Sequence, residues 1–355
     1  MYVSGTPWRT HSRVPRSHSC ERWVWCDELM AAIEAFGSYL PARIVRNDEL
    51  ASRLACESVW IREVSGIEER RYAGAEETVS SMAVAAAREC LGRARKSASD
   101  VGMIIVSSGS SERRFPGPAV TVGQQLGTGQ TPAIDLPLAS AGGLFGMALA
   151  ATLAPQYGNI LVIASEKMST VVAREPLERG VAILFGDGAG ACLIGPAEGP
   201  ARILDHVLHS DGSFAQDLRL EFGAPLAMNG RSVIMQASRK IPAAINEVLE
   251  RNQKPASAIE VFLMHQANQN LIDRVARSLH VEPTKFYSNI ARYGNTSSAS
   301  MLIAASEWWQ APGPRTGDFV CFAAFGAGYN WGAMLISATR PQSLSEKSAE
   351  KDPLK

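Results

Sequence analysis

Three polar residues of types that suit nucleophilic and acid–base chemistry stand where predicted elements begin or end: Ser140, His265 and Asn295. Ser140 precedes a long apolar run, His265 follows a short one that we expect to be a strand, and Asn295 lies in a serine-rich loop. Taken singly, each residue type has an ordinary structural role, as an N-cap, a hydrogen-bonded histidine or a turn residue. Their positions in the chain must decide whether they act together.

The run that follows Ser140 is apolar on every side from Ala141 to Ala154, with no polar face at the 3.6-residue period of a surface helix. We therefore expect a buried helix that begins at a lone hydroxyl. The free N–H groups and the dipole of a helix favour negative charge at its first turn. Ser140 thus stands where a nucleophile would be placed.

Length and composition narrow the class of protein. The chain has 355 residues, which suits about two domains or two fused halves, and its 35 basic residues balance its 35 acidic ones. Its sequence contains no basic patch typical of nucleic-acid binding and no apolar run of the ~18 residues that a membrane span needs. The six cysteines show no CxxC pair and no zinc-ligand spacing. We expect scattered thiols, no metal site and a reducing, cytoplasmic location.

Strand-like runs rich in β-branched residues alternate with helical runs, which predicts an α/β fold with mostly parallel strands. The first half is expected to contain, in order, helix 80–93, strand 101–106, helix 119–126, strand 133–136 and strand 159–164. The second half is expected to contain helix 241–251, strand 259–264, helix 269–279 and a strand pair within 318–337. The similar order predicts a duplication of two halves, 30–200 and 201–338.

The two ends of the chain differ from this patterned middle. Residues 1–29 carry arginines, histidines and tryptophans without periodicity, and they lack the apolar core of a signal peptide. We expect a disordered leader or a mis-assigned start, with translation or the folded domain beginning near Met30. Residues 339–355 are rich in Ser, Lys, Glu and Pro, so we expect a disordered, solvated tail.

Two glycine clusters do not indicate a nucleotide site. The cluster Phe185–Ala191 lies between Val181–Leu184 and Cys192–Ile194, two apolar runs that we interpret as strands. A dinucleotide fingerprint must instead open a helix. The cluster Phe325–Gly332 is likewise followed by a strand, so both clusters favour close backbone approach.

Five motifs occur in a specific order: D-x4-S-A-G at Ser140, R-G-x4-F-G-D-G-A-G-A, H-Q-A-N, G-N-T-S-x-A-S and F-G-x-G-x-x-W-G. With them, the sequence from about 32 to 337 resembles the β-ketoacyl-acyl-carrier-protein synthase III family. The resemblance implies an α/β, thiolase-like fold of five αβαβα layers made from two similar halves, usually as an obligate homodimer. It also implies an acyltransferase of fatty acid or polyketide biosynthesis without a permanently bound cofactor.

The family reaction has two stages. A nucleophile takes an acyl group from a coenzyme A thioester or an acyl carrier protein, and malonyl on acyl carrier protein then loses carbon dioxide and attacks that acyl group. By resemblance, Ser140 holds the nucleophile position, and His265 and Asn295 form the decarboxylating pair. The backbone N–H groups of Ser140 and of a residue near Gly326 would form the oxyanion hole.

The resemblance also assigns substrate contacts. Trp60 and Arg179 hold the positions that bracket the adenine of coenzyme A, and Asn268 belongs to the H-Q-A-N substrate-binding motif. Phe115 matches a residue that crosses the dimer interface to line the partner's acyl pocket.

The nucleophile departs from the family pattern, because cysteine is normal at the position of Ser140. A helix N-terminus contributes up to about 2 kcal/mol to an anion, on the order of 1.5 pKa units, which ionises a thiol near neutral pH but not an alcohol. Serine therefore needs a base, and His265 is the candidate. We expect slow acyl loading and an oxygen ester less reactive than a thioester.

Three explanations of this serine stay open: a natural variant, an introduced Cys→Ser change, and a subunit that has lost condensation. The functional alternatives follow from them. One is acyl transfer to an alcohol, amine or water without carbon–carbon bond formation, and the other is a catalytically silent subunit of a heterodimer.

The donor site departs as well. Val64 and Asn270 stand where the family usually has arginines, so tight binding of coenzyme A in the usual pose is not expected. A hydrogen bond to a charged group is worth ~1.5–3 kcal/mol, and each missing arginine removes at least one. An acidic carrier protein would instead dock on Arg274 and Arg277, which are spaced i, i+3 on one predicted helix face.

Overall fold

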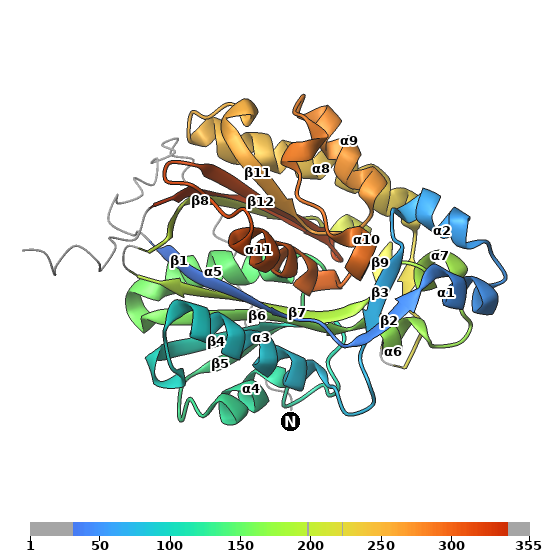
Figure 1. Ribbon diagram of the computed structural model, residues 1–355, viewed down its shortest axis with the longest axis horizontal. Helices are drawn as coiled ribbons and strands as arrows, with labels where there is room; N and C mark the ends of the chain where they lie inside the picture. The colour runs from blue at the N-terminus through green and yellow to red at the C-terminus, as the bar shows by residue number, and fades with distance from the viewer. Residues whose placement is uncertain (1–30, 197–198, 222, 340–355) are drawn as a thin grey trace, which may run out of the picture.

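The computed structural model of the protein describes residues 31–196, 199–221 and 223–339 (Figure 1). Our expectations for residues 1–29 and for the tail after 339 lie outside the described residues. The main sheet contains nine strands, in the spatial order β11 (Ile259–Met264), β12 (Phe319–Gly326), β13 (Asn330–Ala338), β8 (Ala201–Ser210), β1 (Ala32–Tyr39), β7 (Asp187–Gly195), β6 (Asn159–Lys167), β4 (Val101–Ser107) and β5 (Ala133–Leu136).

The pairing of these strands repeats between the two halves. In the first half β4 and β6 are parallel, and β7 and β1 continue the sheet antiparallel. In the second half β11 and β12 are parallel, and β13 and β8 continue antiparallel. Among the described residues, the half-sheets pair where β1 meets β8, at Ala32 and Ile33. The predicted duplication is therefore confirmed. The expectation of mostly parallel strands is wrong, because only β4–β5, β4–β6 and β11–β12 pair parallel among the strands of the described main sheet, and the other five pairs are antiparallel.

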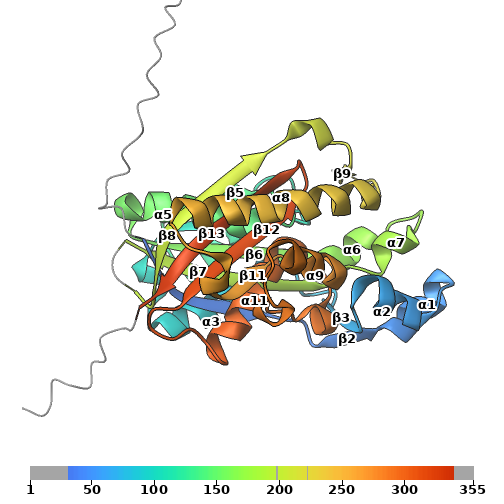
Figure 2. The ribbon, with the colours of Figure 1, turned by 90° about the horizontal axis from the view of Figure 1, so that it is seen from above.

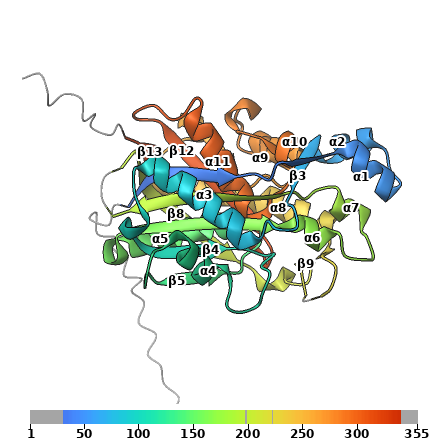
Figure 3. The same cartoon turned by 60° about the horizontal axis from the view of Figure 1, so that its bottom comes forward.

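Helices cover both faces of each half-sheet and give five layers (Figure 1). Helices α3 (Val79–Ala94) and α4 (Pro118–Leu126) lie outside the first half-sheet, and Figure 3 shows α3 crossing its strands. Helices α8 (Gly230–Arg251) and α9 (Gln269–Ser278) lie outside the second, as Figure 2 shows from above. Between the half-sheets lie α5 (Gly142–Tyr157) and α11 (Ser300–Gln310). The five-layered αβαβα arrangement is thus confirmed.

Short elements gather at one end of the half-sheets, beyond the strand ends that carry the motifs (Figure 1). They are β2 (Arg43–Arg46), α1 (Asn47–Leu54), α2 (Ser58–Ser65), β3 (Glu69–Tyr72), α6 (Met168–Val172), α7 (Arg179–Ala182), β9 (Leu218–Arg219), β10 (Ala227–Met228) and α10 (Ile290–Tyr293). Single 3-10 turns complete the chain at Ala98–Asp100, Gly212–Phe214, Ala256–Ala258, Pro283–Lys285 and Ser297–Ala299.

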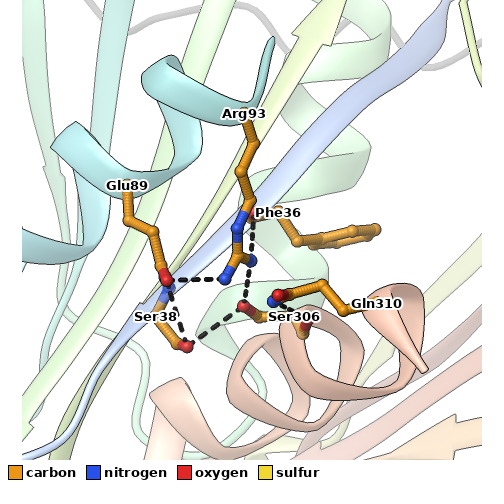
Figure 4. A network of polar contacts seen from close by, with 6 residues as sticks. All are labelled: Phe36, Ser38, Glu89, Arg93, Ser306 and Gln310. Carbon is orange, nitrogen blue, oxygen red and sulfur yellow. Dashed lines mark hydrogen bonds and ion pairs between the residues drawn. The ribbon is translucent and has the colours of Figure 1, made fainter.

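Polar contacts tie the central layer to the first outer layer (Figure 4). Arg93 of α3 donates to Phe36 O of β1 and to Ser306 Oγ of α11, each at 2.8 Å. Its other terminal nitrogen reaches Glu89 Oε1 at 2.5 Å, and Ser306 Oγ donates to Ser38 Oγ at 3.0 Å. Arg93 therefore links α3 of the first half both to β1 and to α11 of the second half.

Two predicted elements differ from the structure. The run Val181–Leu184 is not a strand, because helix α7 ends within it. A single strand, β7, follows from Asp187 and contains the second predicted run, Cys192–Ile194. A short apolar run cannot by itself distinguish a buried helical turn from a strand. Helix α8 begins at Gly230, well before the predicted start at 241. Its first turns expose the apolar Ile234 and Met235 together with Arg231, so the apolar positions there do not follow a single buried face.

Candidate active site

Ser140 sits on a tight turn just before α5. Its φ is +65°, in the left-handed region that is uncommon outside glycine, and the N–H of Ala141 donates across it to Ala139 O at 2.8 Å. Helix α5 begins two residues later, at Gly142, with Ala141 as N-cap residue. The predicted helix start at Ser140 is therefore wrong by two residues. The turn presents the serine at the end of the helix axis, where the dipole still acts.

Helix α5 is mostly buried, as its composition predicts, although Leu149 on one edge is 42% exposed. Its first turn passes between the two halves of the chain. A Cβ at Gly142 would lie 1.8 Å from Ser107 Oγ, and one at Gly143 would lie 2.9 Å from Ser298 O. Glycine at these positions lets the helix end approach both halves, so Ser140 reaches their junction.

His265 directly follows β11 and is buried. Its Nδ1 lies 2.6 Å from Ser300 Oγ, which also accepts from the N–H of Gln266 at 3.0 Å. Burial lowers the pKa of His265 to about 4, against a smaller opposing effect of a hydrogen bond to the Ser297 backbone. The imidazole is therefore neutral at pH 7 and able to accept or donate a proton.

Asn295 comes from the loop before the 3-10 turn Ser297–Ala299 and is also buried. Its backbone N–H donates to Leu184 O at 2.9 Å, so the loop is fixed against the first half. Its side-chain Oδ1 accepts from Ser297 N at 2.8 Å. Because the oxygen is engaged, the amide NH2 is the group that Asn295 offers to a substrate.

One pocket contains all three predicted catalytic residues. It is lined by Ser140 from the first half and by His265 and Asn295 from the second. The rest of its wall is mainly apolar and comes largely from α8, β9, β10, β12 and the segment from the end of β11 to α9; it includes Leu218, Met228, Val233, Ile234, Ala237, Ile241 and Phe325. An alcohol, an imidazole and an amide thus face a space suited to an uncharged thioester arm.

The two groups predicted for the oxyanion hole lie side by side. Gly326, at the end of β12, passes so close to the serine turn that a Cβ there would lie 2.1 Å from Ala139 O and 2.7 Å from Ala141 N. The N–H of Ser140 donates to Ser297 Oγ at 3.1 Å. A substrate oxygen in this hole would therefore have to share or replace the Ser297 hydroxyl.

The predicted adenine bracket is closed. Arg179 Cζ lies 5.1 Å from the centre of the Trp60 ring. An inserted flat ring needs ~3.5 Å from each face, so Arg179 must move before adenine can lie between them. Nearby, Asn268 lines the pocket and donates from Nδ2 to Val64 O at 2.8 Å.

Asn270 does not reach into the pocket mouth. Its Nδ2 lies 3.1 Å from Glu63 O and 3.2 Å from Val64 O, so it binds the end of α2. The side chain of Val64 is partly exposed and apolar. The two positions expected to carry arginine in the family are therefore occupied by groups that do not offer charge to a phosphate.

The structure does not bring Phe115 to the pocket of its own chain. Phe115 is 84% exposed, and it lies beside a large cavity on the other side of the serine turn, lined by Arg114, Gly117, Pro137, Leu138 and Ala139 among others. Strand β5 borders the same cavity and ends the sheet with one edge unpaired. This face is where the resemblance predicts a partner subunit.

Arg274 and Arg277 both lie exposed on α9, whose first turn lines the pocket through Leu271. Among residues 31–196, 199–221 and 223–339, no group of three His, Cys, Asp or Glu side chains is placed to hold a metal ion. Within the same ranges no helix is long and apolar enough to cross a membrane.

Comparison with known proteins identifies the family of this chain. Two family models match, 3-oxoacyl-[acyl-carrier-protein (ACP)] synthase III over residues 134–212 and its C-terminal region over 249–338. A β-ketoacyl-[acyl-carrier-protein] synthase III of Acidiphilium cryptum is 36% identical over 316 residues, 86% of this chain and 98% of that protein. The chain belongs to the synthase III family. It is therefore an enzyme of the acyltransferase class, as the motifs predicted.

Solved structures agree with this membership. The synthase III of Aquifex aeolicus superposes on the chain with a TM-score of 0.83 at 33% identity, over 86% of this chain and 99% of that one. A priming β-ketosynthase of the R1128 polyketide pathway superposes with a TM-score of 0.81 at 29% identity, over 88% and 97%. The thiolase-like fold is thus shared with synthases of both kinds.

Sequence reasoning missed two groups at the site of this synthase III chain. Ser300 stands within the quoted G-N-T-S-x-A-S motif, so the sequence held a signal, but its contact with His265 depends on how α11 meets β11. Glu166 gave no signal. This fully buried carboxylate accepts from Gly109 N, Ser110 Oγ and both the N–H and Oγ of Ser298. It thereby joins the loop after β4 to the turn that carries Ser297.

Proposed function

We propose that this synthase III chain takes an acyl group onto Ser140 Oγ and condenses it with malonyl on acyl carrier protein, with loss of carbon dioxide, in fatty acid or polyketide biosynthesis. The observation that supports this most strongly is the shared pocket of Ser140, His265 and Asn295. Ser140 comes from the first half of the chain and His265 and Asn295 come from the second, so the pocket combines an alcohol with an imidazole and an amide.

Acyl loading joins the donor's carbonyl carbon to Ser140 Oγ. As the new C–O bond forms, the Oγ–H bond breaks, a base accepts the proton, and the donor's thiolate leaves and recovers that proton as a thiol. His265 is our candidate for the base, since burial keeps its ring neutral at pH 7. Backbone N–H groups at Ser140 and Gly326 are our candidates for binding the oxyanion.

Condensation begins when a malonyl thioester occupies the pocket. Its carboxylate leaves as carbon dioxide, and the electron pair of the broken C–C bond becomes an enolate on the thioester. We assign His265 and Asn295 as donors to the enolate oxygen, where charge develops. The enolate carbon then attacks the acyl ester, the C–O bond to Ser140 breaks, and the serine oxygen takes up a proton from solvent.

We infer that the acyl donor is held mainly through its pantetheine arm and acyl chain rather than through an adenine nucleotide. Val64 and Asn270 supply no charge for the phosphates of coenzyme A, and the contact between Trp60 and Arg179 fills the adenine slot. Both coenzyme A and acyl carrier protein present the same uncharged arm to the apolar wall. No permanently bound cofactor enters the proposal.

Carrier-protein docking on Arg274 and Arg277 is part of the proposal. Both side chains are exposed on α9, whose first turn lines the pocket through Leu271, and charge attraction to an acidic partner raises the association rate. Reversal of both charges should weaken carrier-protein binding and make it less sensitive to salt. Charge reversal of Arg202 and Arg315 is the matched control. Both are exposed near the starts of β8 and β12, at the end of the strands away from His265. Unchanged binding after the first reversal would remove this docking site.

A homodimer is the assembly that we propose, with Phe115 lining the partner's acyl pocket. The exposed phenyl ring and the unpaired edge of β5 on the same face support it. Sedimentation of the intact chain should show two copies. Phe115→Trp should shorten the acyl chains accepted, because the ring then fills more of the pocket, and an unchanged chain-length profile would contradict this role.

Mass spectrometry separates the proposed reaction from its alternatives. The protein is incubated with acyl-coenzyme A or acyl carrier protein, then with malonyl carrier protein, and the peptide containing Ser140 is analysed. An acyl-serine that is consumed as carbon dioxide and a lengthened product appear would support condensation. An acyl-serine consumed only by an alcohol, an amine or water would select simple acyl transfer. Failure of every donor to acylate Ser140 would refute the proposal and favour a silent subunit.

A further inference from the structure

Ser300 is the first residue of α11, and its hydroxyl is in contact with the catalytic imidazole. The side chain is 2% exposed. Its Oγ lies 2.6 Å from His265 Nδ1 and 3.0 Å from the backbone nitrogen of Gln266. Bulk water therefore cannot replace either partner, and the pattern of donors and acceptors around this oxygen must be settled within the protein.

Counting hydrogens around Ser300 Oγ decides the pattern. A hydroxyl donates once and accepts twice, whereas a backbone N–H can only donate, so Gln266 occupies one of the two acceptor positions. If Ser300 donates to Nδ1, every group at this oxygen has a partner. If Nδ1–H donates to Ser300, the hydroxyl hydrogen needs another acceptor. Within the described part of the chain, Gln266 N–H is the one other hydrogen-bond partner that Ser300 Oγ has, and it cannot accept.

We infer that Ser300 is a positioning residue that holds His265 in the tautomer protonated at Nε2. With Nδ1 accepting from Ser300, the ring N–H that bonds the Ser297 backbone is Nε2–H, and the same nitrogen is the one left for the pocket that His265 lines. The imidazole therefore meets its substrate as a hydrogen-bond donor. The usual cost of a buried donor without a partner makes this tautomer favoured by about tenfold to a hundredfold.

This inference rests on the proposed function, because acyl loading and condensation require opposite protonation states of His265 Nε2. Condensation needs Nε2–H to donate to the enolate oxygen. Loading needs a bare Nε2 to receive the proton of Ser140 Oγ. The tautomer that Ser300 selects serves condensation, and loading must proceed through the minor one. Loading by His265 is then slowed by the same tenfold to hundredfold factor.

Nitrogen-15 NMR of histidine-labelled protein tests the tautomer directly, without any catalytic activity. The full chain is recorded at pH 7, and the His265 signals are identified by their absence in His265→Gln. Couplings to the ring carbon-bound hydrogens show which nitrogen carries the proton. A proton on Nε2 is expected, and a proton on Nδ1 would overturn the inference even if Ser140 is acylated normally.

Variants then test the role of the serine itself. Ser300→Ala removes the donor to Nδ1, so condensation by an enzyme already acylated at Ser140 should fall tenfold or more while the loading rate is not reduced. Ser300→Thr keeps a hydroxyl and should restore condensation. Ser306→Ala, on the same helix but bound to Arg93, controls for the loss of a buried serine. Equal loss of loading and condensation in Ser300→Ala would show a merely structural role.

The two proposals fail in different ways. If wild-type protein shows the Nε2 tautomer but is acylated by no donor, the proposed function fails and the assignment of Ser300 stands. If acylation and condensation occur but NMR finds the Nδ1 tautomer, the assignment fails and the proposed function stands.

Discussion

Replacing the nucleophile measures how strongly α5 stabilises an anion at position 140. In Ser140→Cys the thiol would occupy the turn before a 16-residue helix, at a site only 9% exposed. The helix end lowers the thiol pKa by up to about 1.5 units, from ~8.5 to ~7. Burial acts in the opposite direction, since it raises the pKa of Cys90 in the α3 core to about 12.

We expect the effect of the helix on the thiol pKa to exceed that of burial at position 140, because Asn295 and His265 place polar side chains in this otherwise mainly apolar pocket. With a pKa near 7, about three-quarters of the introduced thiol is ionised at pH 7.5, against about one-tenth at an ordinary pKa of 8.5. Alkylation at this pH should therefore be roughly eightfold faster than for an unperturbed thiol of equal access.

Iodoacetamide labelling from pH 5.5 to 9.5, followed on the peptide that contains position 140, gives the midpoint of ionisation. Wild-type protein supplies the blank, and the partly exposed Cys56 supplies an internal comparison. A midpoint near 7 is expected, together with faster loading and condensation than in wild type. A midpoint at or above 8.5, or no gain in condensation, would refute the energetic argument that the serine slows this enzyme.

Three further predictions concern the frame of the site. Gly326→Ala should destabilise the fold by about 1–3 kcal/mol and abolish acyl loading, because its Cβ meets backbone at 2.1 Å, whereas Gly212→Ala has open space and should change neither. Glu166→Gln should lower the free energy of unfolding in urea by roughly 1–3 kcal/mol, since an amide NH2 would face donors that the carboxylate now accepts from. Burial lowers the pKa of His265 in the folded state to about 4 from 6.5, so the unfolded chain protonates first as pH falls. Between pH 7 and pH 4, the free energy of unfolding of wild type should therefore fall by about 3 kcal/mol more than that of His265→Gln.

The sequence was most informative where one local pattern determines one element. The bounds of β5 and β11 match the predicted strands, because each is a short apolar run with clear flanking residues. Ser140, His265 and Asn295, which the order of the motifs predicts to act together, line one pocket. The start of α5 was missed because the left-handed backbone at Ser140 depends on Gly326 and on the second half of the chain.

Contacts between residues far apart in the chain could not be predicted from the sequence. Glu166 and Ser298 are 132 residues apart, and Ser300 lies 35 residues after His265. Their pairing follows from how α11 enters between the half-sheets, and periodicity carries no record of that geometry. Asn270 was predicted as a missing charge at the donor site, but its bond to the end of α2 could be seen only in the structure.

The two half-sheets are joined by two residue pairs between β1 and β8, so each half-sheet is largely a separate unit. Ser140 belongs to one repeat and its imidazole and amide to the other, so a polypeptide released after the first repeat holds a nucleophile with nothing to assist it. Acylation at Ser140 would then report completion of the whole chain. Separately produced repeats should regain it only if they reassociate in solution.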